Sequence, residues 1–563
     1  MDKIRLLFSC LCTAFILASC GEKEPDVYGN IELSKTEIEF SARESEAQTY
    51  IKISSSYQWE ATIDVPWLSM SVVRGDAGTE CRCIVSAREN TLQESREGTI
   101  TISSGKAEKK VKVTQARGLM TISKVDVQDL DRIYIPREYE KEYFFSSDGK
   151  WFFGRSAQSE HFIVFWEPGF GEFGETTPSD CPNSRYRVDI AALLEWAEAC
   201  YDCYVGTMKF ADKGGSILDD TKIDIWLEYT TEWAAYGSGL EDKVGCLWIN
   251  PDAARDKSTV AHEVGHSFQY IVGCDLLRNK SVTNVSKAAF RYDIGQGNGF
   301  WEQTSQWQAY MMVPSETFTN YNFLEYCKNV HKHLLHEDNR YTNYFIHHYW
   351  TDRYGIEAVS EVWKAARSPK DAVQVYQELH GLSVAELNAQ IYDYAAHVAT
   401  WDFKGLSESG VSYINKFAWG YVRDDLWYKV ATGVCPEATG FNIIWLNGAA
   451  KGQDVSLEFE GLPNEPGYNS SGDASNAGWT IGLVALGADK KTRYYSDPVT
   501  ADKSTDLKAS VLWTVPEDAY RVWAVVAATP AEYVSHRWDE DNSNDRHWPY
   551  RFIVDGATPV NIR

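Results

Sequence analysis

Residues 262–266 read His-Glu-Val-Gly-His, a pattern that places two imidazoles four positions apart. On an α-helix such residues lie on one face, so His262 and His266 can bind one metal ion. Glu263 is then placed to act as a general base on a water molecule. An apolar stripe from Val260 to Ile271 favours the helix. The alternative is a buried helix whose two histidines are only hydrogen-bonded.

A zinc ion held by two histidines needs a third protein ligand. Glu302 is the preferred candidate, because it follows His266 by 36 positions in a segment expected to begin a helix near Asn298. Asp293 and Glu325 are the fallback ligands. The sequence therefore predicts a Zn²⁺ site made of the two histidines and this glutamate, with a fourth position open to water. The alternative for Glu302 is an exposed carboxylate on a surface helix.

Hydrolysis at such a site also needs a hydrogen-bond donor for the oxyanion that forms on the substrate. We expect the ion to activate a water molecule, from which Glu263 takes a proton and passes it to the leaving group. Tyr344 and His348 are the preferred oxyanion donors, and Tyr310 and His347 are further candidates. The alternative for all four is packing, or hydrogen bonding to the ligands.

With these residues, the centre of the chain resembles the gluzincin metallopeptidases, and more loosely the mucin-directed enhancin-like peptidases. Gln269 and Val272 stand where the metzincin extension has Gly and His, which excludes that class. The gap before Glu302 is longer than in the shortest gluzincins, and Gln306 replaces their aspartate. The resemblance implies a zinc-dependent peptidase that cleaves extracellular protein or glycoprotein. The alternative is a catalytically inactive zincin fold that binds glycans.

The elements that would position this site read as an α+β domain over residues 118–405. Residues 222–229 and 244–250 alternate or run apolar like strands, and helical spacing covers 188–199 and much of 258–400. We expect the strand at 244–250 to form the sheet edge that pairs with an extended peptide substrate. Three tryptophans beside these elements are expected to line the cleft: Trp248, Trp301 and Trp307.

Residues 30–117 show short strands separated by turn residues, as in an immunoglobulin-like β-sandwich. Trp59, the Pro66-Trp67-Leu68 run, residues 96–100 and the closing 113–115 run make this segment similar to the BACON domain of Bacteroidetes. The resemblance implies either carbohydrate binding or a spacer. We expect Trp59 and Trp67 to fill the core, since strand aromatics usually do.

The first twenty residues have the form of a bacterial lipoprotein signal. Lys3 and Arg5 precede a short apolar run, and the exit Leu17-Ala18-Ser19-Cys20 resembles a lipobox. Lipid on Cys20 would anchor the protein in the outer membrane, and residues 21–29 would form a tether. Acidic residues after Cys20 resemble the export signal of Bacteroidetes surface lipoproteins, which predicts exposure at the cell surface.

Residues 406–563 carry further strand patterns and predict a C-terminal β-sandwich. The formal net charge of −25 disfavours a nucleic-acid partner, because an acidic surface repels phosphate. Nine cysteines outside the signal lack the regular spacing of a disulfide framework, and Cys200 and Cys203 form an isolated CxxC. The acidic run 539–545 lacks the glycine and final glutamate of an EF-hand, which favours a solvated loop over a calcium site.

Overall fold

The computed structural model describes residues 30–562, apart from positions 93 and 140 and segments 119–126, 172–173, 283–289, 291–297 and 471–472. The signal segment, Cys20, the tether and Asp293 therefore lie outside the described residues. The chain forms two compact units, Met1–Ile122 and Ser123–Arg563. The boundary predicted near residue 405 lies inside the second unit. No helix among the described residues combines the length and apolar character needed to cross a lipid bilayer.

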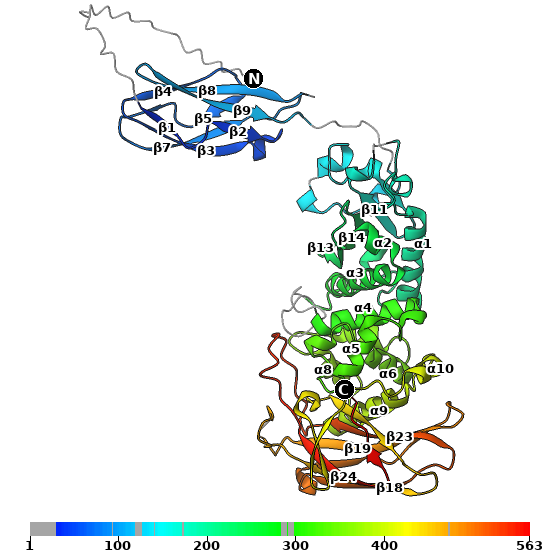
Figure 1. Ribbon diagram of the computed structural model, residues 1–563. Helices are drawn as coiled ribbons and strands as arrows, with labels where there is room; N and C mark the ends of the chain where they lie inside the picture. The colour runs from blue at the N-terminus through cyan, green and yellow to red at the C-terminus, as the bar shows by residue number, and fades with distance from the viewer. Residues whose placement is uncertain are drawn as a thin grey trace, which may run out of the picture. The chain divides into compact units, whose positions relative to one another are not determined.

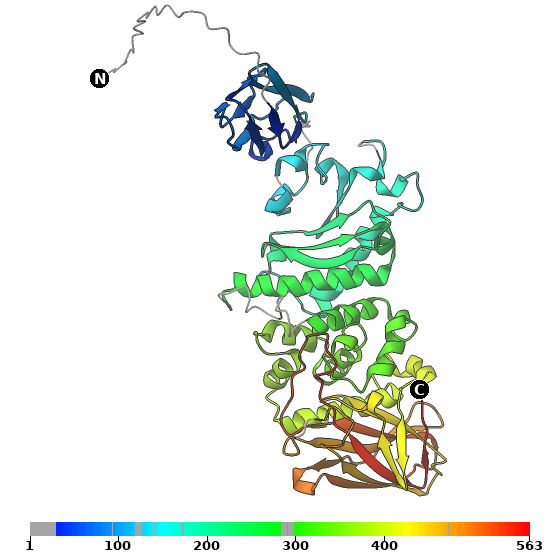
Figure 2. The ribbon, with the colours of Figure 1, turned by 60° about the vertical axis from the view of Figure 1, so that its left-hand side comes forward.

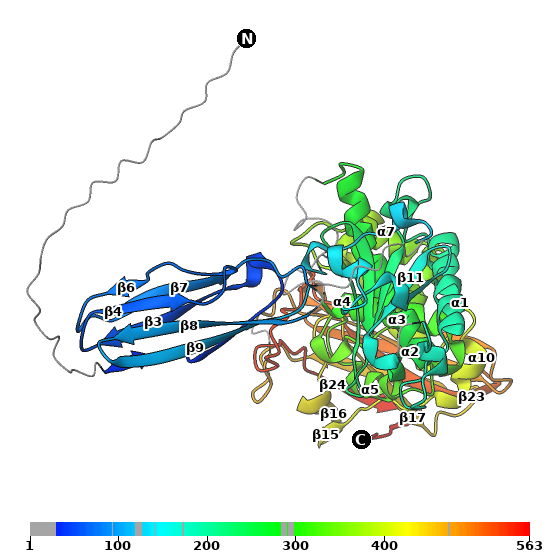
Figure 3. The same ribbon diagram turned by 90° about the horizontal axis from the view of Figure 1, so that it is seen from above.

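The first unit consists of two β-sheets that share one core (Figures 1 and 3). Trp59 is fully buried in this core and Trp67 packs against it, as predicted, while the Arg96 guanidinium lies 4.5 Å from the centre of the Trp67 ring. One sheet has the order β1 (Ile31–Leu33), β3 (Gln48–Ser55), β7 (Cys81–Ala87), β5 (Leu68–Met70). The other has the order β2 (Glu37–Phe40), β9 (Ala107–Gln115), β8 (Arg96–Ser104), β4 (Trp59–Ile63), β6 (Arg74–Gly75).

The second unit begins with a mixed five-stranded sheet whose central strands are parallel and almost wholly buried, with Asp224 as the one charged residue in β11 and β12. Such strands are buried on both faces. Turns from residues 127–155 cover one face with an aromatic cluster, and helices α1 (Ile190–Tyr201) and α3 (Lys257–Arg278) cover the other (Figure 2). The sheet order is β10 (Ser156–Gln158), β11 (Phe162–Trp166), β12 (Ile223–Leu227), β14 (Val244–Ile249), β13 (Ala235–Leu240).

A helical layer follows the sheet and lies between it and the C-terminal strands (Figure 2). Helix α9 (Val384–Thr400) opens with a capping box, in which the side chains of Ser383 and Glu386 each accept from the other's backbone N–H. The helices are α1 (Ile190–Tyr201), α2 (Pro251–Arg255), α3 (Lys257–Arg278), α4 (Asn298–Met312), α5 (Tyr321–Asn329), α6 (Phe345–Tyr354), α7 (Ala358–Ala365), α8 (Ala372–Leu379) and α9 (Val384–Thr400), followed by the single turn α10 (Ser407–Gly410).

The C-terminal strands form two further sheets, as the sequence predicts. Strands β19 (Gly478–Gly487) and β23 (Ala519–Ala528) are buried along almost their whole length, because one face meets the other sheet and the opposite face meets α9. One sheet has the order β15 (Tyr421–Asp424), β16 (Trp427–Val430), β24 (Tyr550–Asp555), β18 (Asp454–Gly461), β22 (Lys508–Thr514). The other has β20 (Arg493–Tyr495), β19 (Gly478–Gly487), β23 (Ala519–Ala528), β17 (Phe441–Asn447), β25 (Thr558–Pro559), with β21 (Val499–Asp502) also on β19.

Candidate metal centre and catalytic pocket

Helix α3 carries the His-Glu-Val-Gly-His pattern and is buried from Val260 to Cys274, between the sheet and α4. The apolar stripe packs in the core, which leaves His262 and His266 on the side that meets α4. Gly265 permits the close approach of the two helices, because a Cβ there would lie 2.4 Å from Gln308 Oε1. The glycine inside the motif therefore has a packing role that brings α4 within reach of the imidazoles.

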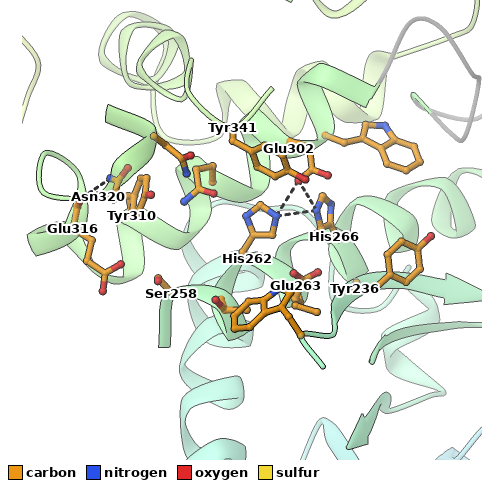
Figure 4. A pocket seen from close by; sticks show the side chains of 17 residues that line it. Tyr236, Ser258, His262, Glu263, His266, Glu302, Tyr310, Glu316, Asn320 and Tyr341 are labelled. Atoms are coloured by element: carbon orange, nitrogen blue, oxygen red, sulfur yellow. Dashed lines mark hydrogen bonds and ion pairs between the residues drawn. The ribbon is translucent and has the colours of Figure 1, made fainter. Parts of the chain in front are cut away.

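The predicted ligands converge (Figure 4). Glu302 Oε2 lies 3.0 Å from His262 Nε2 and 3.1 Å from His266 Nε2, and the two Nε2 atoms are 3.0 Å apart. Tetrahedral zinc with bonds of about 2.0–2.1 Å spaces its ligand atoms about 3.3 Å apart. The three atoms form a nearly regular triangle of almost that size, so the residues present fit a small divalent ion.

The protonation of His266 also suits a metal ligand. Its Nδ1 is 3.0 Å from Oε1 of Gln269, and Nε2 of Gln269 donates to the Trp301 carbonyl and to Ser305 Oγ at 2.9 and 2.8 Å. These donations orient the amide, so its oxygen accepts a hydrogen bond from the Nδ1–H of His266. In the neutral ring, Nε2 then has a free lone pair. Metal-binding histidines are typically held in this way by a second group.

Electrostatics at the triangle favours a positive charge. Burial lowers the pKa of His266, but the Glu302 carboxylate outweighs it and raises the pKa to about 9. Burial acts to raise the pKa of Glu302, yet the two histidines hold it well below its usual range. The centre of the triangle therefore stabilises a cation, either a proton or a metal ion.

The triangle opens into a pocket of about 490 Å³ (Figure 4). Glu263 lines it beside the histidines, as expected for a general base. Tyr341 also lines it, and its ring centre is 6.1 Å from that of His262. Burial and the Glu302 carboxylate raise the pKa of Tyr341, which keeps its hydroxyl a proton donor. The chain segment that carries Tyr341 has no sequence pattern that marks it as part of a site.

The structure does not bring the two preferred oxyanion donors to the pocket. Tyr344 is fully buried in the helical core, where its hydroxyl donates to the Thr317 carbonyl at 2.7 Å. His348 is buried on α6, and neither residue lines the pocket. His347 is 3.0 Å from Thr304 Oγ1 in the same core. These side chains face inward because α6 is packed on the surrounding helices, whereas Tyr341 lines the pocket.

Further candidates from the sequence separate in the same way. Tyr310 and Trp301 line the pocket, whereas Trp307 is fully buried in the core. Trp248 donates to the Tyr139 hydroxyl on the opposite face of the sheet. The fallback ligand Glu325 instead forms an ion pair with Lys328 at 2.6 Å. Two exposed aromatics at the pocket were missed: Trp233 and Tyr236.

The predicted edge strand is also wrong. β14 lies between β12 and β13. The edge is formed by β13, which precedes β14 in the chain and pairs antiparallel with it through a short turn. β13 lies directly on α3: a Cβ at Gly237 would be 2.1 Å from the carbonyl oxygen of Glu263. The edge strand of the sheet therefore runs beside Glu263.

A second group of buried histidines and carboxylates lies where the segment between β23 and β24 rises along the helices (Figures 1 and 2). His336 Nε2 is 3.1 Å from Asp545 Oδ2 and 3.8 Å from Glu437 Oε1, and His536 Nε2 is 2.6 Å from Glu337 Oε2. Nδ1 of His336 accepts a backbone N–H at 2.9 Å, so Nε2 of the neutral ring carries the proton. We interpret this group as a hydrogen-bonded network.

The acidic run 539–545 belongs to this network. The backbone N–H groups of Asp539 and Glu540 donate to Glu337 Oε1, and Asp541 accepts from the Ser543 N–H within its own turn. These bonds favour a loop over a calcium site. The nine cysteines of the described residues are free, and burial raises the pKa of both Cys200 and Cys203, as expected for structural thiols.

Comparisons with known proteins match two parts of the chain to two different family models. Residues 54–116 match the BACON model ("Putative binding domain, N-terminal"). No curated protein matches the chain. One similar solved structure is a GH5 xyloglucanase of Bacteroides ovatus in complex with a XXXG heptasaccharide, with 12% sequence identity and a TM-score of 0.17. The match covers 51% of this chain and 62% of that one. Another is a protein from Bacteroides thetaiotaomicron, with 16% identity and a TM-score of 0.13, which covers 18% of this chain and 98% of that one.

At these TM-scores the structural likenesses say nothing about function. The second unit is matched instead by a family model that spans residues 125–561, which is most of the chain and includes the metal-ligand triangle, the pocket and the C-terminal sheets. The chain therefore belongs to the family described as "Family of unknown function (DUF6055)" and carries an N-terminal BACON domain.

Proposed function

We propose that the protein is a zinc-dependent peptidase with a zincin-like centre, which cleaves extracellular protein or glycoprotein. The observation that carries the proposal is the triangle of His262 Nε2, His266 Nε2 and Glu302 Oε2 at the floor of an open pocket, with Glu263 beside it. The donor set of two imidazoles and one carboxylate is the one that hydrolytic zinc sites use. Resemblance to the gluzincins rests on the same residues.

The groups around the triangle have distinct roles in this reaction. A bound zinc ion would supply Lewis-acid activation of water and of the scissile carbonyl. Glu263 takes a proton from the attacking water and returns it to the leaving amine. The Tyr341 hydroxyl donates a hydrogen bond to the oxyanion. The exposed edge of β13 binds the substrate backbone as an added strand, which aligns the scissile bond with the triangle.

The experiment that tests the proposal combines metal analysis with peptide hydrolysis on the mature full-length protein. We expect about one zinc per chain, lost in His262→Ala, and release of new peptide termini by the wild type. Glu263→Gln is expected to retain the zinc and to lose hydrolysis by about a hundredfold or more. Hydrolysis that persists in Glu263→Gln would sink the mechanism, and absence of stoichiometric zinc would sink the metal centre.

A glycan-binding protein without catalysis is the second candidate, and one observation favours it. Trp233 and Tyr236 line the pocket with 64% and 55% of their surface exposed, and such aromatic faces stack on sugars. Wild-type protein that binds glycans, loses that binding in Trp233→Ala and cleaves no peptide would favour this candidate over the peptidase.

We further propose that lipid on Cys20 anchors the protein in the outer membrane, with its described units outside the cell. The support is the lipobox-like run before Cys20 and the acidic residues after it. Radiolabelled palmitate should label the wild type but not Cys20→Ser, and protease added to intact cells should digest the wild type. A Cys20→Ser protein that stays membrane-bound would refute the anchor.

A further inference from the structure

One carboxylate of the pocket has no role in the chemistry proposed above. Three glutamates line the pocket, and Glu263 and Glu302 are the base and the ligand. The third is Glu316, at the side of the pocket opposite Tyr236 (Figure 4). Among the described residues that line this pocket, none is lysine or arginine. The pocket therefore has an excess of negative charge that the metal and its ligands do not account for.

The backbone around Glu316 is fixed, while its carboxylate is left available. Glu316 ends the turn Pro314–Glu316 between α4 and α5. Its carbonyl accepts from the backbone N–H groups of Thr319 and Asn320, and Asn320 in turn caps α5. The carboxylate makes no hydrogen bond or ion pair with another described residue. A charge held on a fixed turn, without a partner of its own, is organised in advance for a ligand.

Neutral polar groups share the pocket with this carboxylate. Tyr310 and Asn320 lie on the same side of the pocket as Glu316 (Figure 4), and Gln306 and Asn322 also line it. The pKa of Tyr310 is raised by burial and by the charge of Glu316, so its hydroxyl stays neutral. Hydroxyl and amide oxygens can share the N–H donors of an ammonium or guanidinium group with one carboxylate. The part of the pocket that contains Glu316 is thus suited to a cation rather than to an apolar or anionic side chain.

We propose that Glu316 binds a positively charged group of the substrate beside the metal centre, and so makes the protein selective for cationic peptides. This inference rests on the proposed peptidase function and names its substrate class. The cation has two sources with the same chemistry: the side chain of Lys or Arg near the scissile bond, or the free amino terminus of a peptide.

The experiment uses zinc-loaded full-length protein and an equimolar library of synthetic peptides, each made with a free and with an acetylated amino terminus. Lysine positions are paired with norleucine, which keeps the length and removes the charge. We expect kcat/KM to be about tenfold or more higher for the cationic member of a pair. Loss of the preference on acetylation identifies the amino terminus as the cation, and loss with norleucine identifies the side chain.

Glu316→Gln should abolish the preference while neutral peptides are still cleaved, and Glu316→Lys should reverse it toward acidic peptides. The matched control is Glu325→Gln on α5, a neighbouring neutralisation outside the pocket, which should keep the preference. Equal kcat/KM for charged and neutral peptides in the wild type, or an unchanged preference in Glu316→Gln, overturns the inference. A uniform loss of hydrolysis in Glu316→Gln on all peptides overturns it as well, because a specificity residue would spare neutral ones.

A binding measurement separates this inference from the proposed function. Labelled cationic and norleucine peptides are titrated by fluorescence anisotropy into Glu263→Gln and into the Glu263→Gln, Glu316→Gln double variant. Tighter binding of the cationic peptide that depends on Glu316 supports the inference, even if the wild type cleaves nothing and the peptidase proposal fails. Binding that is equal for both peptides overturns the inference, even if hydrolysis is observed.

Discussion

Gln269 offers a test of the metal centre that leaves all three ligands in place. Its Oε1 accepts from Nδ1 of His266 at 3.0 Å, while its Nε2 donates to the Trp301 carbonyl and to Ser305 Oγ at 2.9 and 2.8 Å. Gln269→Leu keeps a side chain of similar size and removes the acceptor that holds the proton on Nδ1. The proton can then occupy Nε2, where it competes with the ion.

The size of the effect follows from these contacts. Loss of such a supporting partner typically weakens metal binding by 10- to 100-fold, which is about 1.4–2.7 kcal/mol. Gln269 is only 4% exposed, so water does not readily replace its oxygen, and we expect a value toward the upper end. The Trp301 carbonyl and the Ser305 hydroxyl also lose a donor, which costs about 1–3 kcal/mol of folding free energy.

Zinc affinity is measured by competition with a chromophoric chelator, and folding free energy by urea unfolding of the metal-free protein. The matched control is Gln390→Leu: Gln390 is also buried, its amide likewise accepts from one side chain and donates to another, and it lies on α9, outside the pocket. The control should bind zinc as tightly as the wild type. The reasoning is refuted if Gln269→Leu keeps wild-type zinc affinity, or if the control weakens binding as much.

Three further perturbations test the pocket, the edge strand and the C-terminal segment. Tyr341→Phe should lower kcat by about 10²–10³-fold at nearly unchanged KM, since it removes one oxyanion donor; an unchanged kcat would exclude that role. Gly237→Ala should destabilise the second unit by about 3 kcal/mol or more in urea unfolding, because its Cβ would lie 2.1 Å from the Glu263 carbonyl oxygen. Burial acts to lower the pKa of His536, but the Glu337 carboxylate outweighs burial, so the pKa of His536 is raised overall. Burial acts to raise the pKa of Glu337, but the hydrogen bonds that it accepts, led by the one from His536, together outweigh burial, so the pKa of Glu337 is lowered overall. The pair should therefore stabilise the fold between about pH 4.5 and 6.5, losing its effect as the pH rises through the raised histidine value or falls through the lowered glutamate value. His536→Gln should flatten the unfolding free energy across that range, and an unchanged pH profile would contradict the assignment.

The part of the site that the sequence predicts is the part fixed by local geometry. His262 and His266 share a helix face because four residues complete about one turn, and Glu302 falls on the next long helix along the chain. Tyr341 could not be found in this way, because it lies on a loop whose distance from the triangle depends on the packing of several helices. Tyr344 illustrates the same limit: it lies only three positions farther along the chain, yet its side chain is in the core.

The edge of the sheet was misassigned for a topological reason. The 244–250 strand shortly precedes the helix that carries His262 and His266 and is strongly apolar, so chain order alone puts it next to the candidate site. β13 has the glycine-rich sequence Ala-Tyr-Gly-Ser-Gly-Leu, which has weak strand propensity. Its small residues are nevertheless required, because Gly237 contacts the backbone of α3 and Gly239 contacts Tyr270. The glycines that let β13 pack closely on α3 also lower its strand propensity, so a prediction based on propensity misses this strand.

Composition cannot separate a metal centre from a structural network, but the hydrogen bond on the far nitrogen of an imidazole can. His266 and His336 are both buried, and each has a carboxylate oxygen 3.1 Å from Nε2. In the neutral ring of His266 the other nitrogen faces an amide oxygen, so it must donate and Nε2 keeps a lone pair. At His336 the other nitrogen faces a backbone N–H, so it must accept and Nε2 keeps the proton. A lone pair can bind an ion and an N–H cannot, so the two clusters, similar in residue type, differ in what they can do.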